Sequence, residues 1–166
     1  MSSPPHLGKF INPNSHPVSE FANGLSGTCL CGSINVTIND PELFSRPRGH
    51  ICHCANCRKV AGSYAASNLI IEEDKVAIED RQGTLKVFVD TQTGSGNPLQ
   101  RYFCSQCGNP IKSVTPLRKG WVIVKMGIFP RIPNPEFESF ALHKHDWEDV
   151  PKGVTQFKIA LGGERV

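Results

Sequence analysis

No long hydrophobic run occurs in this sequence. The apolar stretches fall far short of the roughly 18 residues that a membrane-spanning helix needs. The N-terminus also lacks the apolar segment and the small-residue cleavage site of a secretory signal. These absences lead us to expect a chain that does not enter a membrane and that works in the cytoplasm.

A strong excess of one charge is missing too. The formal net charge at pH 7 is +3, and the basic residues are scattered along the chain. Domains that bind nucleic acids usually have a more basic surface, with the cations clustered on one face. We therefore do not expect a nucleic acid as partner. The scattered cations include Arg46, Arg48, Arg58, Lys59, Lys112, Arg118 and Lys119.

Sustained helical periodicity is the third absence, since no window repeats apolar residues at helical spacing. Short alternating or β-branched runs take its place, and 15 glycines and 13 prolines among 166 residues indicate many turns. Short strands separated by turn residues are typical of an antiparallel, mostly β domain. One helical turn is expected at 55–61, before Gly62. The expected strands lie at 34–38, 69–71, 76–78, 85–89 and 121–126.

The chain length fits one domain that can fold on its own apolar core. Residues 1–23 contain four prolines and little apolar content up to Ser19, so we expect a flexible or extended N-terminal arm there. The folded zinc domain is expected over residues 24–160, and a short C-terminal tail over 161–166.

The seven cysteines fall into three clusters, each at ligand spacing. In a reducing compartment such clusters bind metal or perform chemistry more often than they form disulfides. The spacing therefore predicts two zinc ions per chain. The clusters are a C-x-C pair (Cys29 and Cys31), a C-x-C-x-x-C trio (Cys52, Cys54 and Cys57) and a C-x-x-C-G turn (Cys104, Cys107 and Gly108).

The C-x-x-C-G turn has the form of a zinc knuckle, in which glycine lets the chain adopt the left-handed conformation. A knuckle supplies two ligands, whereas a structural zinc is almost always bound by four ligands in a tetrahedron. The other isolated pair is the obvious source of the remaining two. We predict a structural zinc on Cys29, Cys31, Cys104 and Cys107, which would join an early strand to a late one.

The middle cluster has three cysteines and no fourth. Three protein ligands with one open position are the arrangement of a catalytic zinc, so we predict Cys52, Cys54 and Cys57 as the catalytic centre. His50 and His53 are candidate fourth ligands. On an extended strand, however, the side chain of His53 would face away from Cys52 and Cys54. A redox-active cluster beside a single structural zinc is the alternative.

Three strings in this sequence resemble the glutathione-dependent formaldehyde-activating enzyme family, which includes the centromere protein V-like proteins. They are G-T-C-L-C-G-S-I at 27–34, C-H-C-A-N-C-R-K-V-A-G-S at 52–63 and R-Y-F-C-S-Q-C-G-N-P-I at 101–111. The resemblance implies a small zinc-stabilised β fold, called a β-tent and similar to Mss4. It assigns the outer four cysteines to a structural zinc and the middle three to a catalytic zinc.

The resemblance runs from about Gly24 to Trp147, with a departure at Glu138-Ser139-Phe140, where family members commonly carry a His-Ile-Phe-like string. It implies a carbon–sulfur lyase that acts on a thiol–aldehyde adduct similar to S-hydroxymethylglutathione, or on a larger analogue. Glutathione or another thiol would be the cosubstrate. The alternatives are a binding module in which zinc only supports a surface, and an enzyme that uses zinc-bound water.

Six further side chains near the middle cluster or late in the chain are candidates for supporting roles. Cations could offset the charge of the thiolates, hydroxyl groups could donate to a developing alkoxide, and histidines could shuttle protons. Surface or turn positions are the competing interpretation for all of them. The candidates are Arg58 and Lys59, Ser63 and Tyr64, and His143 and His145.

Overall fold

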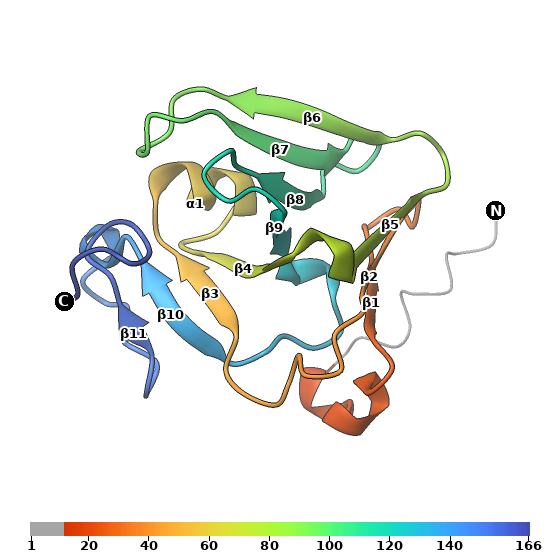
Figure 1. The fold of residues 1–166 in the computed structure, drawn as a ribbon, viewed down its shortest axis with the longest axis horizontal. Helices are drawn as coiled ribbons and strands as arrows, with labels where there is room; N and C mark the ends of the chain where they lie inside the picture. The colour runs from red at the N-terminus through yellow and green to blue at the C-terminus, as the bar shows by residue number, and fades with distance from the viewer. Residues whose placement is uncertain (1–11) are drawn as a thin grey trace.

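Two β-sheets and one short α-helix form the part of the chain that the computed structural model describes, residues 12–166 (Figure 1). The smaller sheet is antiparallel, with strand order β1-β2-β5. The larger sheet has the order β11-β10-β3-β4-β9-β8-β7-β6. The strands are β1 (Leu25–Thr28), β2 (Ile34–Ile38), β3 (Gly49–Cys52), β4 (Ala66–Glu72), β5 (Val76–Asp80), β6 (Leu85–Asp90), β7 (Leu99–Cys104), β8 (Pro110–Val114), β9 (Trp121–Lys125), β10 (Pro135–Ser139) and β11 (Thr155–Gln156).

The apolar core joins the smaller sheet to the middle of the larger one. Inward-facing residues alternate along β2 and meet side chains from β4, β8 and β9. This packing explains the period-two pattern at 34–38, because alternate residues of a strand face opposite sides of its sheet. The fully buried core side chains include Leu25, Ile34, Val36, Ile38, Leu69, Ile71, Ile111 and Val124.

The mostly β fold class is confirmed, with strands in each of the five segments where the sequence predicts them. The antiparallel expectation is wrong at one edge, because β10 runs parallel to β3 and also to β11. A parallel partner needs a long connection, and β3 and β10 are more than 80 residues apart in the sequence. Period-two patterns indicate strands without indicating their direction.

Short helices occur at the connections. The α-helix α1 (Ala55–Ala61) ends before Gly62, as expected. It begins directly after Cys54, contains Cys57 and contacts β4. The 3₁₀ helices are η1 (Pro13–Ser15), η2 (Val18–Phe21), η3 (Glu73–Lys75), η4 (Met126–Ile128) and η5 (Ala141–His143).

The second half of the predicted arm lies on the domain. Arg131 donates to the backbone carbonyls of Pro13 (3.2 Å) and His16 (2.6 Å). Phe21 packs against the core, with its ring centroid 5.6 Å from that of Phe44. The remainder of the arm, residues 1–11, lies outside the described residues.

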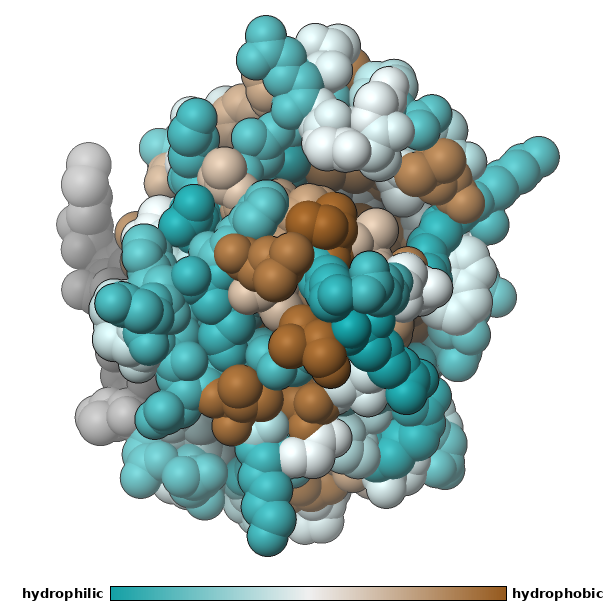
Figure 2. Space-filling model, turned by 90° about the vertical axis from the view of Figure 1, so that its left-hand side faces the viewer, coloured by the Kyte–Doolittle hydropathy of each residue, from teal (hydrophilic) through white to brown (hydrophobic). Residues whose placement is uncertain are grey.

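Within residues 12–166, no helix has the length and apolar character to cross a membrane. The face that carries the C-terminal segment nevertheless has hydrophobic side chains gathered near its centre, among hydrophilic ones (Figure 2). The exposed large apolar residues after β10 include Leu142, Trp147, Val150 and Ile159.

We expect that replacing Gly27 by alanine destabilises the protein. A Cβ at this position in β1 would lie 2.5 Å from the carbonyl oxygen of Ile128 and 2.8 Å from Cδ1 of Phe129. Overpacking of this kind lowers the free energy of unfolding by roughly 1–3 kcal/mol. Urea unfolding of the zinc-loaded protein measures the change. Gly127→Ala is the control, because a Cβ there meets nothing within 4 Å; equal effects of the two substitutions would contradict the packing argument.

Candidate metal centres and the adjoining cavity

Four cysteines from two distant turns lie together. The sulfur atoms of Cys29, Cys31, Cys104 and Cys107 are all within 4.8 Å of one another. The Cys29–Cys31 and Cys31–Cys104 sulfur distances are 3.5 and 3.6 Å. A tetrahedron with zinc–sulfur bonds of about 2.3 Å has edges of about 3.8 Å. The four sulfurs therefore fit a tetrahedral zinc ion.

Backbone hydrogen bonds shape both turns. Gly108 has a φ of 74°, which favours glycine, and its N–H donates to the carbonyl of Cys104 at 2.8 Å. The backbone N–H of Leu30 donates to Oδ1 of Asn109 at 2.8 Å, which connects the two turns directly. The N–H of Ile34 donates to the sulfur of Cys29 at 3.3 Å. These hydrogen bonds thus hold the turns so that the sulfurs face one another.

A buried hydroxyl group supports this cluster. The Oγ of Ser33 lies 3.6, 3.2 and 3.4 Å from the sulfurs of Cys29, Cys31 and Cys104. Oγ1 of Thr84 is 2.8 Å from the same oxygen. Burial raises the pKa of Cys104, but hydrogen bonds from Ser33 and Thr84 outweigh it and lower this pKa to about 5. The surroundings therefore favour the thiolate form that binds metal.

The other three cysteines form a second cluster at the end of β3 and the start of α1. The sulfurs of Cys52, Cys54 and Cys57 lie within 4.8 Å of one another. Cys54 is the N-cap of α1, and its sulfur accepts the N–H of Cys57 at 3.3 Å. Cys52 is buried, whereas Cys54 and Cys57 are partly exposed. Among the described residues, no histidine, aspartate, glutamate or further cysteine joins this group, so it offers three ligands and an open side.

His53 lies on the opposite side of the chain from the three sulfurs. Its Nδ1 is 3.1 Å from a carboxylate oxygen of Glu148, and its Nε2 is 3.5 Å from one of Glu138. All three side chains are at most 3% exposed. Side chains alternate in direction along this extended segment, so His53 faces away from Cys52 and Cys54, as predicted. It packs between two carboxylates instead.

A buried row of polar side chains crosses three strands next to the three-cysteine cluster. His50 of β3 pairs with Asn68 of β4, which pairs with Lys125 of β9. Nζ of Lys125 donates to Oδ1 of Asn68 at 2.7 Å. Cys52 lies two residues after His50, so its sulfur is on the same face as this row. A lysine is rarely buried without a charge partner, and the nearby thiolates can supply it.

A second buried cation lies on β7. Nε and Nη2 of Arg101 donate to Oδ2 of Asp90 at 2.8 and 2.7 Å. The same oxygen accepts from Nδ2 of Asn56 at 2.9 Å, which anchors α1 to the end of β6. Nη1 of Arg101 is buried and has no partner among the described residues.

These surroundings favour the loss of a proton from the three-thiol cluster. Hydrogen bonds from Cys52 and Cys54 lower the pKa of Cys57, and the charges of Lys125 and Arg101 add to this effect. The hydrogen bond to Cys54 raises the pKa of Cys52 in turn, so the three groups share protons in the absence of metal. The cations would hold the cluster in an anionic state.

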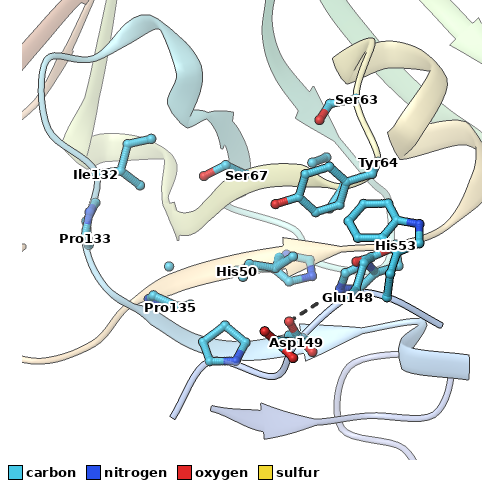
Figure 3. A pocket seen from close by; sticks show the side chains of 17 residues that line it. His50, His53, Ser63, Tyr64, Ser67, Ile132, Pro133, Pro135, Glu148 and Asp149 are labelled. Carbon is cyan, nitrogen blue, oxygen red and sulfur yellow. Dashed lines mark ion pairs between the residues drawn. The ribbon is translucent and has the colours of Figure 1, made fainter. Parts of the chain in front are cut away.

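A cavity of about 580 Å³ lies along β3, the strand that ends at Cys52 (Figure 3). His50, Ile51 and His53, which flank Cys52 in the sequence, line one side of it. Tyr64 and Trp147 stand at its edge, with an edge-to-face contact between rings whose centroids are 5.4 Å apart. The lining also includes Ser63, Ser67, Ile132, Pro133, Pro135, Glu138, Glu148, Asp149 and Pro151.

The other candidates from the sequence have different positions. Ser63 and Tyr64 line the cavity. Arg58 contacts His145, with Nη1 3.1 Å from Nε2, and the ring of His145 stacks on Trp147. The ring of His143 lies near Phe140. Lys59, next to Arg58, is not part of the cavity lining.

Sequence reasoning missed the residues that surround the sulfurs. None of Ser33, Lys125 and Arg101 belongs to a ligand motif. Ser33 follows Cys31 by two residues, whereas Lys125 and Arg101 are far in the sequence from the three cysteines that they influence. One signal was present: Lys125 follows the apolar run Val122–Val124, where a buried position is expected.

One known protein family matches most of this chain. A family model described as "Glutathione-dependent formaldehyde-activating enzyme" matches residues 24–145, a segment that contains all seven cysteines. Among solved structures, the crystal structure of a Rhodobacter sphaeroides protein is similar, with a TM-score of 0.47 and 20% identity; the similarity covers 63% of this chain and 86% of that one. No curated protein matches the chain.

Substitutions in the two clusters are expected to have different consequences. Cys104→Ser should release one zinc ion per chain and loosen the fold, because a structural zinc contributes roughly 10–16 kcal/mol of apparent binding energy. Cys54→Ser should release one zinc ion and leave the fold intact, since serine can also cap α1. Elemental analysis and circular dichroism measure both effects. Unchanged zinc content in either variant would contradict the assignment of that cluster.

Removal of the hydroxyl group of Ser33 should weaken the four-cysteine site. Loss of a supporting hydrogen bond around a metal typically lowers metal affinity by about 10- to 100-fold. Competition with a chromophoric chelator would measure the affinity of Ser33→Ala. Ser26→Ala is the matched control, because the Ser26 hydroxyl contacts only Thr37 on the exposed side of β1. Equal zinc affinity of the two variants would exclude a supporting role for Ser33.

Proposed function

The chain belongs to the glutathione-dependent formaldehyde-activating enzyme family, and from this we propose that it is a zinc-dependent carbon–sulfur lyase. Its substrate would be a thiol–aldehyde adduct similar to S-hydroxymethylglutathione, or a larger analogue, with glutathione or another thiol as cosubstrate. The observation that carries the proposal is the three-cysteine cluster, which offers three ligands and an open side. A purely structural role would not need a metal with a free position.

We assign different roles to the two clusters. Cys29, Cys31, Cys104 and Cys107 would hold a structural zinc, and Cys52, Cys54 and Cys57 a catalytic zinc. With three thiolate ligands, zinc would take the substrate sulfur at its open position and keep it deprotonated. The zinc domain would extend over residues 24–160, between the arm at 1–23 and the tail at 161–166.

The proposed reaction breaks one bond and moves one proton. The carbon–sulfur bond of the adduct breaks, and its electron pair goes to the sulfur. The hydroxyl oxygen on the same carbon gives its proton to the solvent and becomes the carbonyl oxygen of the aldehyde, and the sulfur regains a proton when the thiol is released. The reverse reaction forms the adduct.

Lys125 compensates the charge of this site. Three thiolates and a divalent cation have a formal charge of −1, which becomes −2 when the substrate sulfur arrives as a thiolate. Asp90 already balances Arg101, whereas the one hydrogen-bond partner of Lys125 within residues 12–166 is the neutral Asn68. The buried ammonium group therefore lowers the electrostatic cost of a fourth sulfur.

We expect Cys54→Ser to lower kcat/KM by at least 100-fold while the four-cysteine site keeps its zinc. Adduct formation between glutathione and formaldehyde, and then between other thiols and larger aldehydes, can be followed by NMR exchange spectroscopy. Turnover that is unaffected by this substitution would contradict the proposal. Turnover of a substrate in the absence of any thiol would instead favour chemistry by zinc-bound water.

Lys125→Met should lower kcat/KM by roughly tenfold or more through the loss of a positive charge close to the reacting sulfur. Zinc content and circular dichroism would verify that the variant folds and binds metal. Lys112→Met is the control, since Lys112 lies on β8 over the ring of Tyr102 and contacts Glu73 at 3.3 Å. Equal activity of the two folded variants would exclude the role of Lys125.

A further inference from the structure

The cavity along β3 has the size of a small-molecule site. Its volume of about 580 Å³ falls within the range of roughly 300–1,000 Å³ for ligand pockets. No cysteine lines it, so what it binds does not depend on the reaction proposed above. Ile132, Pro133 and Pro135 give one wall an apolar surface, opposite Tyr64 (Figure 3).

Carboxylates set the charge of the cavity. Its lining contains Glu138, Glu148 and Asp149, and no lysine or arginine among the described residues. Lys144 contacts Glu138 at 3.2 Å and is the one lysine or arginine recorded in contact with these carboxylates in the described chain. The three carboxylates and Lys144 together have a formal charge of −2. A proton on His53 would change the sum to −1. An anionic ligand would meet repulsion here.

The three carboxylates are not equivalent. Glu138 and Glu148 are buried and bind protein partners: Glu138 accepts from Gln156 at 2.7 Å, and Glu148 accepts from the backbone N–H of His145 at 2.9 Å. Asp149 is exposed, and its carboxylate has no hydrogen bond or ion pair to another described residue. Asp149 is therefore the carboxylate that is available to a ligand.

A buried ring nitrogen also lacks a partner at this cavity. Nε2 of His50 is 2.7 Å from Oγ of Ser139, and the ring stacks on Phe137 with centroids 4.7 Å apart. Nδ1 is buried and has no hydrogen-bond partner among residues 12–166. The His50 side chain is 8% exposed and belongs to the cavity lining. A buried polar atom without a partner is costly, and an N–H group of a ligand would satisfy it.

Exposed aromatic faces complete the site. Trp147 is 64% exposed and Tyr64 is 54% exposed, although their rings contact each other and His145 stacks on one face of Trp147. The faces of tryptophan and tyrosine attract cations, and tryptophan attracts them most strongly. The same two rings also offer apolar area to the body of a ligand.

We propose that this cavity binds a small organic cation, consisting of an ammonium group on an apolar or aromatic body. The ammonium group contacts Asp149 and supplies the hydrogen that Nδ1 of His50 lacks. The apolar body lies against Tyr64, Trp147 and the proline-rich wall.

Three probes of nearly the same shape test the charge preference. Benzylamine, benzyl alcohol and benzoate would be titrated into the zinc-loaded Trp121→Phe variant, in which Trp147 is the sole tryptophan. Benzylamine should change the Trp147 fluorescence in a saturable way. Benzyl alcohol should bind at least tenfold more weakly, because it lacks the charge, and benzoate should not bind. Equal binding of the three probes, or no binding of benzylamine, would overturn the proposal.

A pair of substitutions on one loop locates the binding site. Asp149→Asn should weaken benzylamine binding about five- to tenfold, since an ammonium–carboxylate contact becomes a neutral one. Asp146→Asn should have no effect, because Asp146 is exposed on the same loop and does not line the cavity. Equal affinities of the two variants would refute the role of Asp149, whether or not the protein has lyase activity.

Discussion

The contact between four sulfur atoms is the constraint on which the rest of the structure depends. Cys29 and Cys31 lie in the turn between two strands of the smaller sheet, and Cys104 and Cys107 in a turn of the larger one. A zinc ion on these sulfurs would join the two sheets at one end, while the apolar core joins them along their length. Its binding energy is comparable to the whole stability of a typical domain. The strands that carry the second cluster are therefore positioned by the first.

The two cysteine clusters differ in what surrounds them rather than in their sulfur chemistry. Neutral hydroxyl groups of Ser33 and Thr84 lie beside the four-cysteine cluster, which is closed. Buried cations lie near the three-cysteine cluster, which has one open side. Neutral hydrogen-bond donors are sufficient at a metal site whose net charge stays constant. Cations suit a site that must accept a further negative charge, which is why Lys125 matters for the proposed reaction.

The strand β3 and the residues after it separate two environments. On one face, Cys52 belongs to the sulfur cluster; on the other, His53 lies between the buried carboxylates of Glu138 and Glu148. Alternation along a single extended segment thus places a metal centre and an acidic cavity within a few residues of each other.

The sequence by itself determined the local features: the cysteine pairs and trio, the period-two strands, the helix before Gly62, and the outward direction of His53. These features depend on spacing within a few residues, and short-range geometry does not need the rest of the fold. Only the tertiary structure decided that β10 runs parallel to β3. It also decided that Lys125 lies in a row with Asn68 and His50. Finally, it placed Trp147, Asp149 and Tyr64 around one cavity. These neighbours are tens of residues apart, and their contacts arise from strand order and register, which no local pattern specifies.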